Sequence, residues 1–239
     1  MSQFLIFRLH GAFSAFGAVT VGKVRNVSHF PTRSGILGFV CSALGVGRDD
    51  EELQLKVHQG YGMALRVDRE GEVLSDFHIV QVPDPKQEYF VAADAMGKKH
   101  NNIITQREYR QGAIYTVALW ARSEAPYTLE ELKKSLNEPK WNLFLGRKNC
   151  PVAVPLEPQL IEGANLKEGF AKSSFKSDEL DLKYLLKDLA NPKVFWDSDA
   201  ISGMPLQQTL SVRDQLISRS RWQFGNRPVQ VGTYNHPQN

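Results

Sequence analysis

The strongest constraint on the fold is one stretch of apolar, helix-forming sequence in the first quarter of the chain. Pro31 and Thr32 mark its start, because proline blocks an earlier helix and the threonine hydroxyl can accept a bond from an N–H of the first turn. Apolar side chains between Ile36 and Leu44 cover almost the whole circumference, and Gly45 supplies a C-terminal stop. A helix that is apolar on all sides is buried. The sequence therefore predicts a core helix here.

The start of this helix is also a predicted anion site. Its free N–H groups and positive dipole end attract anions, and Arg33, Ser34 and Gly35 form its first turn. The preceding chain is basic: residues 1–48 contain no Asp or Glu, and their cations are Arg8, Lys23, Arg25, Arg33 and Arg48. Such a segment indicates a polyanionic partner, nucleic acid first. The alternative is a core helix whose first-turn arginine meets only solvent.

The remainder of the first 137 residues alternates strands and helices. Strands are predicted at 4–9, 61–68, 73–82 and 114–121, and an amphipathic helix at 127–137. The strands 61–68 and 73–82 are expected to form a hairpin around Glu70-Gly71-Glu72. The acids Asp49 to Glu52 are expected to begin a solvated helix rather than to hold a metal. This order is close to the β-α-β-β-α-β order of a ferredoxin-like (RRM-like) domain, with the last strand unclear, so an α+β fold is predicted.

Two basic segments interrupt this pattern. Residues 83–112 read as a long irregular insertion in which Lys98, Lys99, His100, Arg107 and Tyr109 combine positive charge with aromatic rings. That combination suits RNA, since cations meet phosphates and rings stack on bases, although a disordered surface loop has the same composition. Residues 139–151 carry Lys140, Arg147 and Lys148 without an acid, and are either a phosphate-contact loop or a basic surface loop.

The character of the chain changes after Pro151. Three prolines suit an irregular start to a new unit, and the stretch from Leu206 to Val231 is rich in arginine, with Arg219 and Arg221 beside aromatic residues. We therefore expect two domains: residues 1–150, RNA-binding, and residues 151–239, small and mainly β, with a basic face.

Several classes of function lack support in the sequence. The six histidines form no metal-spaced pair with another His or Cys, and the sequence contains no nucleophile motif, so no cofactor, metal or catalytic residue is predicted. No apolar run reaches 18 residues, so no membrane span is expected. The two cysteines suggest no disulfide framework, which favours a reducing, cytoplasmic location.

Five motifs, in register along the chain, carry a family resemblance. They are FPTRSGILGFVCSALGVGRDD at 30–50, Gly11 to Gly17, Thr105 to Tyr109, Thr116 to Trp120, and Leu145 to Pro151. Together they resemble the CasD family of type I-E CRISPR Cascade subunits, members of the RAMP superfamily. The resemblance covers about residues 1–151 well and the remainder loosely.

This resemblance implies an RNA-binding, non-enzymatic subunit of an antiviral ribonucleoprotein complex. It would cap the 5′ handle of the CRISPR RNA, nucleate backbone assembly beside CasC and the PAM-reading CasA, and meet target DNA only through the guide. Residues 83–112 would form a thumb over the guide, and Phe16, where most relatives have tryptophan, would stack on a base. The candidate RNA-binding residues are then Phe16, Arg25, Arg33, Ser34, Gly35, Lys98, Lys99, His100, Arg107, Tyr109, Lys140, Arg147, Lys148, Arg219 and Arg221.

Two other functions stay open. A metal-independent endoribonuclease that processes its own guide RNA could use Lys99 as stabiliser and His100 as general acid–base. The chain departs from the pattern of such relatives because residues 25–60 contain no tyrosine. A general single-strand RNA chaperone would explain the charge but not the order of the five motifs.

Overall fold

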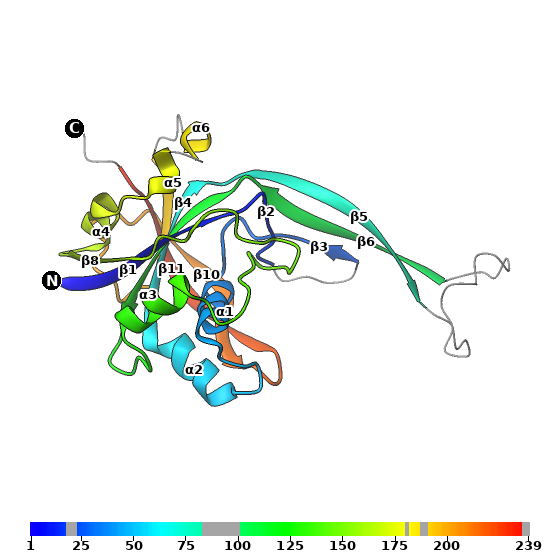
Figure 1. Ribbon diagram of the computed structural model, residues 1–239, viewed down its shortest axis with the longest axis horizontal. Helices are drawn as coiled ribbons and strands as arrows, with labels where there is room; N and C mark the ends of the chain where they lie inside the picture. The colour runs from blue at the N-terminus through cyan, green and yellow to red at the C-terminus, as the bar shows by residue number, and fades with distance from the viewer. Residues whose placement is uncertain (18–22, 83–100, 180–181, 187–190, 236–239) are drawn as a thin grey trace.

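The computed structural model describes residues 1–17, 23–82, 101–179, 182–186 and 191–235. Its body is built on a seven-stranded sheet in which all neighbouring strands are antiparallel (Figure 1). The order across the sheet is β10 (Gln208–Ser218), β11 (Gln223–Thr233), β9 (Lys193–Trp196), β4 (Tyr61–Arg69), β7 (Ile114–Ala121), β1 (Ser2–His10) and β8 (Gln159–Gly163).

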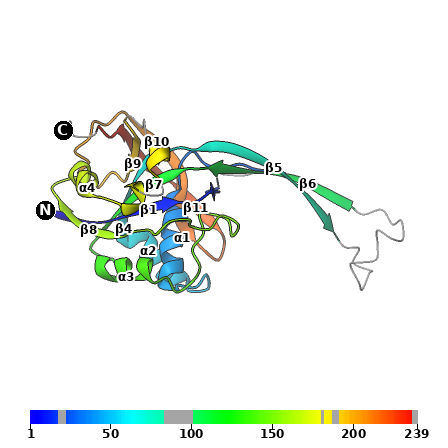
Figure 2. The ribbon, with the colours of Figure 1, turned by 45° about the horizontal axis from the view of Figure 1, so that its top comes forward.

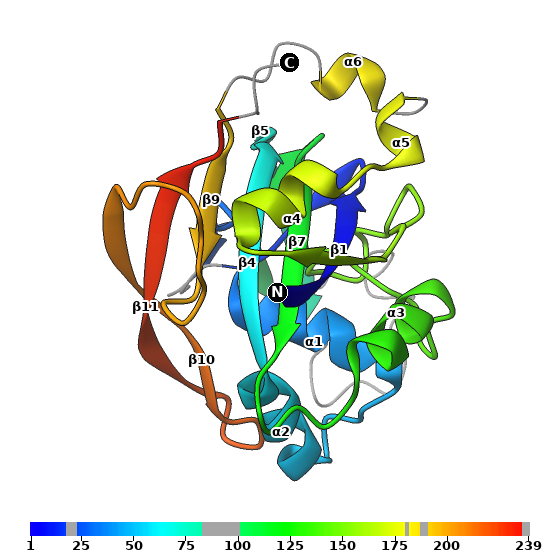
Figure 3. The same ribbon diagram turned by 90° about the vertical axis from the view of Figure 1, so that its left-hand side faces the viewer.

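Helices cover both faces of this sheet (Figure 3). On one face lie α1 (Arg33–Leu44), α2 (Glu51–Gly60) and α3 (Leu129–Asn137), and the core there joins α1 to alternate residues of β1 such as Phe7. On the other lie α4 (Leu166–Lys172) and the short helices α5 (Lys176–Glu179) and α6 (Lys183–Leu186). The intervening β1 residues, such as Ile6, pack there with Phe170 of α4. The apolar side chains of β1 between Phe4 and Leu9 thus enter one or the other of two cores, as the strand period requires.

The predicted core helix is confirmed, with both of its ends. The Thr32 hydroxyl accepts a bond from the Gly35 N–H at 3.3 Å, and Gly45 closes the helix in the left-handed region, with φ 74°. The acidic run after it also begins a helix, as predicted: Asp50 caps α2 by accepting a bond from the Leu53 N–H at 3.1 Å.

A second, smaller sheet forms a long hairpin that projects from the body (Figures 1 and 2). Its arms are β5 (Glu72–Val82) and β6 (Asn101–Gln111), paired along their whole length. Near the body, the other edge of β6 pairs with β2 (Phe13–Ser14), antiparallel, and β3 (Val24–Arg25), parallel.

The sequence predicted strands at the positions of β4 and β5 but not their pairing. The expected hairpin of 61–68 with 73–82 is wrong: β4 pairs with β7 and β9, while β5 pairs with β6. Burial gives the reason, because side chains along most of β4 are buried on both faces, whereas those of Glu72 to Phe77 are exposed. The expected irregular insertion is also wrong for residues 101–111, which form β6; residues 83–100 lie outside the described part.

The C-terminal third does not form a sheet of its own. Strand β8 pairs with β1 and β9 pairs with β4, so the chain after Pro151 extends the sheet begun by the N-terminal part at two places. The expected boundary at 150 and 151 therefore does not separate two sheets. The predicted short C-terminal strands are longer than expected, since β10 and β11 have 11 residues each.

Candidate nucleic-acid interface

Three of the sequence motifs meet at the base of the projecting hairpin. The loop around Ala15 lies against the loop that begins at Leu145, where the Ala15 N–H donates to the Leu145 carbonyl at 2.8 Å. Gly146 makes this approach possible: its φ is 95°, and a Cβ there would lie 2.2 Å from the Ala15 carbonyl oxygen. Only glycine fits such a position without strain.

Tyr109 of β6 lies in the centre of this junction. Its ring is buried and meets the edge of Phe13 with centroids 6.0 Å apart, and its hydroxyl accepts a bond from the Asn149 amide at 2.9 Å. The guanidinium of Arg147 covers the ring at 4.9 Å from its centroid. Tyr109 is therefore a buried anchor for the 145–151 loop and offers no free face for stacking on a base, contrary to the expectation.

Arg147 also joins the two strands that carry the neighbouring cations. One guanidinium nitrogen donates to the Glu108 carbonyl of β6 at 2.9 Å, and another donates to the Arg25 carbonyl of β3 at 3.1 Å. The planar guanidinium suits this double contact because its N–H groups point in fixed directions.

One face of the hairpin base is basic. Arg25 is the strand neighbour of Arg107, so their side chains leave the sheet on the same face. Lys23, two positions before Arg25, is exposed, and the Arg147 guanidinium lies at this junction, followed in the chain by the exposed Lys148. Asp76, opposite Arg107 on β5, is an acid on this face and pairs with His78 at 2.7 Å. We call the group of Lys23, Arg25, Arg107 and Lys148 the basic face.

The opposite face of the same hairpin carries exposed apolar side chains, which we call the apolar face. They come from alternate positions of β5 and β6, beside the polar Ser75, Gln106 and Glu108, and are exposed to 54% at Val73, 58% at Phe77, 60% at Ile79 and 44% at Ile104. On β3, Val24 is 38% exposed. It is the strand neighbour of Gln106, so its side chain leaves the sheet on this same face. A ribbon of two strands is at best marginally stable alone in water, so this apolar face suits contact with another macromolecule.

Arg33 does not occupy an anion site open to a ligand, which corrects the sequence expectation. Its side chain is buried: it pairs with Asp197 and donates to the carbonyls of Tyr61 and, at 2.7 Å, His58. Burial lowers its pKa. At the helix start, the Arg33 backbone N–H donates to the Asp214 carboxylate at 2.6 Å. The chain thus fills its own anion site with a carboxylate.

The other two residues of the first turn of α1, Ser34 and Gly35, also have hydrogen-bond partners within the protein. The Gly35 N–H is taken by the Thr32 hydroxyl, and Ser34 lies 3.3 Å from the same hydroxyl oxygen. Neither residue lies on the basic face.

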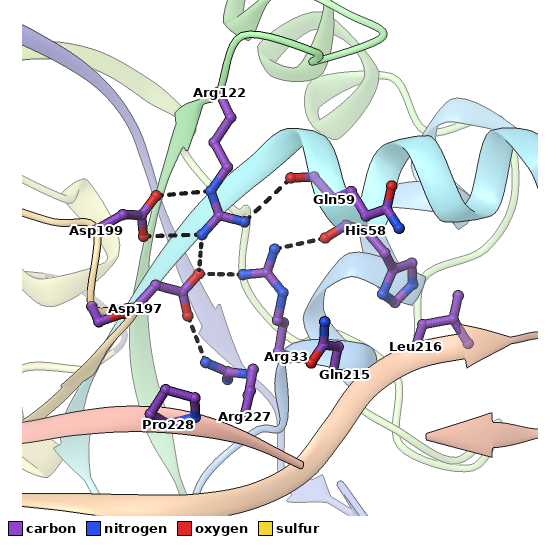
Figure 4. Close-up of a pocket in the computed structure, with 11 residues that line it drawn as sticks. Arg33, His58, Gln59, Arg122, Asp197, Asp199, Gln215, Leu216, Arg227 and Pro228 are labelled. Atoms are coloured by element: carbon purple, nitrogen blue, oxygen red, sulfur yellow. Dashed lines mark hydrogen bonds and ion pairs between the residues drawn. The ribbon is translucent and has the colours of Figure 1, made fainter. Parts of the chain in front are cut away.

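A polar pocket of about 410 Å³ opens over this network (Figure 4). Its centre is Asp197, which accepts bonds from Arg33, from Arg122 at 3.0 Å, from Arg227 at 2.5 Å and from the Met63 N–H at 3.1 Å. Arg227 also pairs with Asp214 and Arg122 with Asp199. Three arginines face three aspartates, so the network is balanced in charge and lacks the surplus of cations that a nucleic-acid site requires.

This network joins α1, β4, β10 and β11 to the residues that follow β7 and β9, and we assign it a structural role. Sequence reasoning missed it. The one available signal was Asp214, the single acid within an arginine-rich stretch, because a lone acid among cations is a natural ion-pair partner.

The remaining candidates lie elsewhere. Phe16 is buried and meets Tyr115 edge to face at 6.3 Å, so it is a core residue and not a stacking platform. Lys140 is exposed, and its N–H is bound to the Ala43 carbonyl, after the end of α3. Lys98, Lys99 and His100 lie outside the described residues.

Arg219 and Arg221 lie at the turn between β10 and β11, beside α2 (Figure 1). The Arg219 guanidinium stacks on Trp222 at 3.9 Å, and the Arg219 N–H donates to Glu51. The register places this turn beyond the Tyr61 end of β4, whereas the projecting hairpin leaves from the Arg69 end. The structure therefore does not bring these arginines together with the basic face.

Within the described residues, no cluster of His, Cys, Asp or Glu could hold a metal ion. Across the same part of the chain, no helix is long and apolar enough to cross a membrane. Both cysteines are free and buried.

Comparison with known proteins assigns this fold. A family profile described as CRISPR-associated protein (Cas_Cas5) matches residues 4–230, which places the chain among the CRISPR-associated proteins. Within that class, the chain belongs to the Cas5 family.

Relatives agree with this assignment. The CRISPR system Cascade subunit CasD of Escherichia coli (strain K12) is 36% identical over 160 residues, which are 65% of this chain and 70% of that protein. A chain of a solved CRISPR RNA-guided surveillance complex has a similar fold, with a TM-score of 0.69 and 22% identity over 98% of this chain and 91% of its own. A solved Cas protein matches with a TM-score of 0.61 and 22% identity, over 99% and 98% of the two chains.

Proposed function

We propose that this protein is an RNA-binding structural subunit of a type I-E CRISPR Cascade complex that caps the 5′ handle of the CRISPR RNA. The observation that carries the proposal is the hairpin base, where Arg25 and Arg107 leave the sheet on one face and the exposed Lys23 and Lys148 lie close in the chain to Arg25 and Arg147. Phosphate contacts dominate the affinity of such sites, and the guanidinium groups suit phosphate geometry.

Similarity to known proteins supports the complex in which this would occur. The relative at 36% identity is named a Cascade subunit, and a chain of similar fold belongs to an RNA-guided surveillance complex. In such a complex the guide would recognise target DNA by base pairing, and this subunit would hold the backbone and shape of the guide.

The two faces of the hairpin suggest how the subunit joins its neighbours. The basic face would take the handle, while Phe77, Ile79 and the other exposed apolar residues would pack against the backbone subunit CasC. The large subunit CasA would contact the body. We infer that the order β4-β7-β1-β8 represents a ferredoxin-like core, with β5 and β6 as the stem of its thumb.

We further propose that the protein holds its guide without cleaving it. Its phosphate-facing groups are arginine and lysine, which suit binding, and among the described residues no histidine lies on the basic face beyond His78, which pairs with Asp76. Incubating the purified protein with repeat RNA in EDTA tests this directly. Specific cleavage that disappears in His100→Ala would establish the endoribonuclease instead.

The binding proposal is tested by removing the charge of the basic face. In Arg25→Ala/Arg107→Ala/Lys148→Ala we expect the affinity for the 5′ repeat-derived segment of the organism's CRISPR RNA to fall at least a hundredfold. This follows from about 1–3 kcal/mol for each charged contact. Co-expression with CasC and guide RNA should then yield little assembled complex.

A matched control removes three cations elsewhere. Lys134, Lys167 and Lys172 lie on α3 and α4, away from the hairpin, and the triple alanine variant has the same net charge as the test variant. We expect less than a threefold change in affinity for it. Equal losses in both triple variants would show that only net charge matters and would contradict a defined site.

A further inference from the structure

Arg147 occupies an unusual place beside the basic face. It belongs to a basic motif and was expected to contact phosphate, yet the structure directs two of its nitrogens to backbone carbonyls of β6 and β3. A side chain that bridges two strands fixes their separation. We propose that Arg147 is a positioning residue of the RNA site that acts through Arg25, an inference that rests on the proposed binding of RNA at this face.

The need for such a residue follows from how short β3 is. The strand has two residues, both exposed. Besides its pairing with β6, its neighbourhood is held by the bonds from the Gln106 N–H to the Lys23 carbonyl and from the Val27 N–H to Glu108, both at 3.1 Å. Further along the chain, the Ser28 N–H donates to the Phe16 carbonyl and the Ser28 carbonyl accepts from Arg110, both at 2.8 Å. Arg147 adds the contact at Arg25 itself, the residue whose side chain would meet the RNA.

The other end of this contact is rigid. The Cys150 N–H donates to the Arg147 carbonyl at 2.9 Å, and the Leu145 N–H donates to the Cys150 carbonyl at 2.7 Å, which closes the loop. Asn149 bonds the buried Tyr109 hydroxyl, and the Arg147 guanidinium lies over the same ring. The loop therefore connects the buried core of the hairpin base to the Arg25 backbone through one side chain.

Preorganisation is the physical consequence. With Arg147 in place, the Arg25 side chain starts from a fixed strand beside Arg107, so RNA binding orders only the side chain. Without it, RNA must also order the β3 backbone, which lowers affinity but leaves the number of phosphate contacts unchanged. Lysine cannot replace arginine here, because a single ammonium group cannot serve two carbonyls with the geometry of a planar guanidinium.

These properties separate positioning from direct contact in a titration with the same handle RNA at several salt concentrations. If Arg147 is a positioning residue, Arg147→Ala and Arg147→Lys each weaken RNA binding about tenfold, and both keep the slope of log K against log salt. Arg25→Ala weakens binding about tenfold and lowers that slope by about 0.7, the value for one phosphate on a single strand. Direct contact gives the reverse: Arg147→Lys binds like the wild type, and Arg147→Ala loses about 0.7 of slope.

A double-mutant cycle names the residue through which Arg147 acts. If Arg147 positions Arg25, the Arg25→Ala/Arg147→Ala variant binds about as weakly as Arg25→Ala alone, because the strand no longer carries a contact. In a second cycle, which combines Arg147→Ala with Lys148→Ala, the two losses of affinity multiply, to about a hundredfold. Multiplying losses in both cycles would overturn the inference.

Folding and function remain distinguishable in this design. Each variant is first checked for a cooperative thermal melt. Arg147→Gln is a milder replacement, because its amide keeps a donor for one of the two carbonyls, and its expected loss of affinity is intermediate. If Arg25→Ala and Lys148→Ala both bind like the wild type, the proposed RNA site itself fails. If they lose affinity while Arg147→Lys does not, only the positioning role fails.

Discussion

Replacing Asp197 with asparagine tests the buried ion-pair network that holds the C-terminal strands to α1. Asparagine keeps the volume and one acceptor oxygen but removes the negative charge. Asp197 is 7% exposed in its side chain and accepts bonds from three arginines, of which Arg33 is 5% exposed and Arg227 11%. The substitution therefore leaves the buried guanidinium groups of Arg33 and Arg227 near each other without the negative charge of Asp197 between them.

The expected cost follows from this burial. Removing one partner of a buried pair typically costs about 3–5 kcal/mol, and the conserved volume means that no cavity adds to it. For a chain of this length, 1 kcal/mol corresponds to a shift in Tm of roughly 2–4 °C, so Asp197→Asn should lower Tm by roughly 6–20 °C. The measurements are a thermal melt followed by circular dichroism and a urea titration, which gives the free energy of unfolding.

Asp199 supplies the matched control. It pairs with Arg122 in the same network but its side chain is 43% exposed, so Asp199→Asn should cost no more than about 1 kcal/mol. The second arm is Arg33→Met/Asp197→Asn, which removes the uncompensated guanidinium and should be more stable than Asp197→Asn alone. Equal Tm values for Asp197→Asn and Asp199→Asn would refute the structural role of the network.

Three further predictions concern single features. Burial and the nearby Arg33 lower the pKa of His58 to about 3, so the folded protein keeps this histidine neutral where the unfolded chain, with its ordinary pKa of 6.5, binds a proton. Stability should therefore fall on acidification from pH 6.5 towards pH 3, by about 1.4 kcal/mol per pH unit from this group, and urea titrations of His58→Leu should lack that component. Burial raises the pKa of Cys41 to about 12 and also raises that of Cys150, so neither thiol should react with iodoacetamide at pH 8 until urea unfolds the chain, as mass spectrometry would show; alkylation of the native protein would contradict their burial. Phe77→Ser/Ile79→Ser should change the free energy of unfolding by less than about 1 kcal/mol, because both side chains are largely exposed, but should impair pull-down of CasC; unimpaired pull-down would remove the apolar face from that interface.

The features that could be predicted from sequence are those whose causes lie within a few residues. The cap at Thr32, the apolar body and the stop at Gly45 are all local, and α1 begins and ends where they indicate. The strands β1, β4, β5 and β7 were likewise predicted from their local patterns, whereas β6 was expected to be irregular. The pairing of these strands was not predicted. Which strand lies beside β4 depends on the burial of both faces of β4 in the assembled sheet. The sequences of neighbouring segments such as β4 and β5 carry no local signal against their pairing.

The candidate site shows the same limit in its side chains. Charge counting correctly marked the N-terminal segment as basic, but it could not show that Arg33 is neutralised by Asp197 and Asp214, which lie 164 and 181 positions further along the chain. Arg147 presents a related case, since its partners are backbone carbonyls that no residue pattern reveals. The motifs at Ala15, Tyr109 and Leu145 were identified separately, and only the fold shows that they meet.

Crosslinking tests the central claim, that the basic face holds the guide handle, most directly. Handle RNA carrying 4-thiouridine is bound to the protein, alone and in complex with CasC, irradiated, and digested, and the crosslinked peptides are identified by mass spectrometry. We predict adducts within residues 23–25, 105–109 and 147–149, and none on Arg33 or Phe16, which the structure buries. Adducts confined to the β10–β11 turn around Arg219, with none at the hairpin base, would contradict the account.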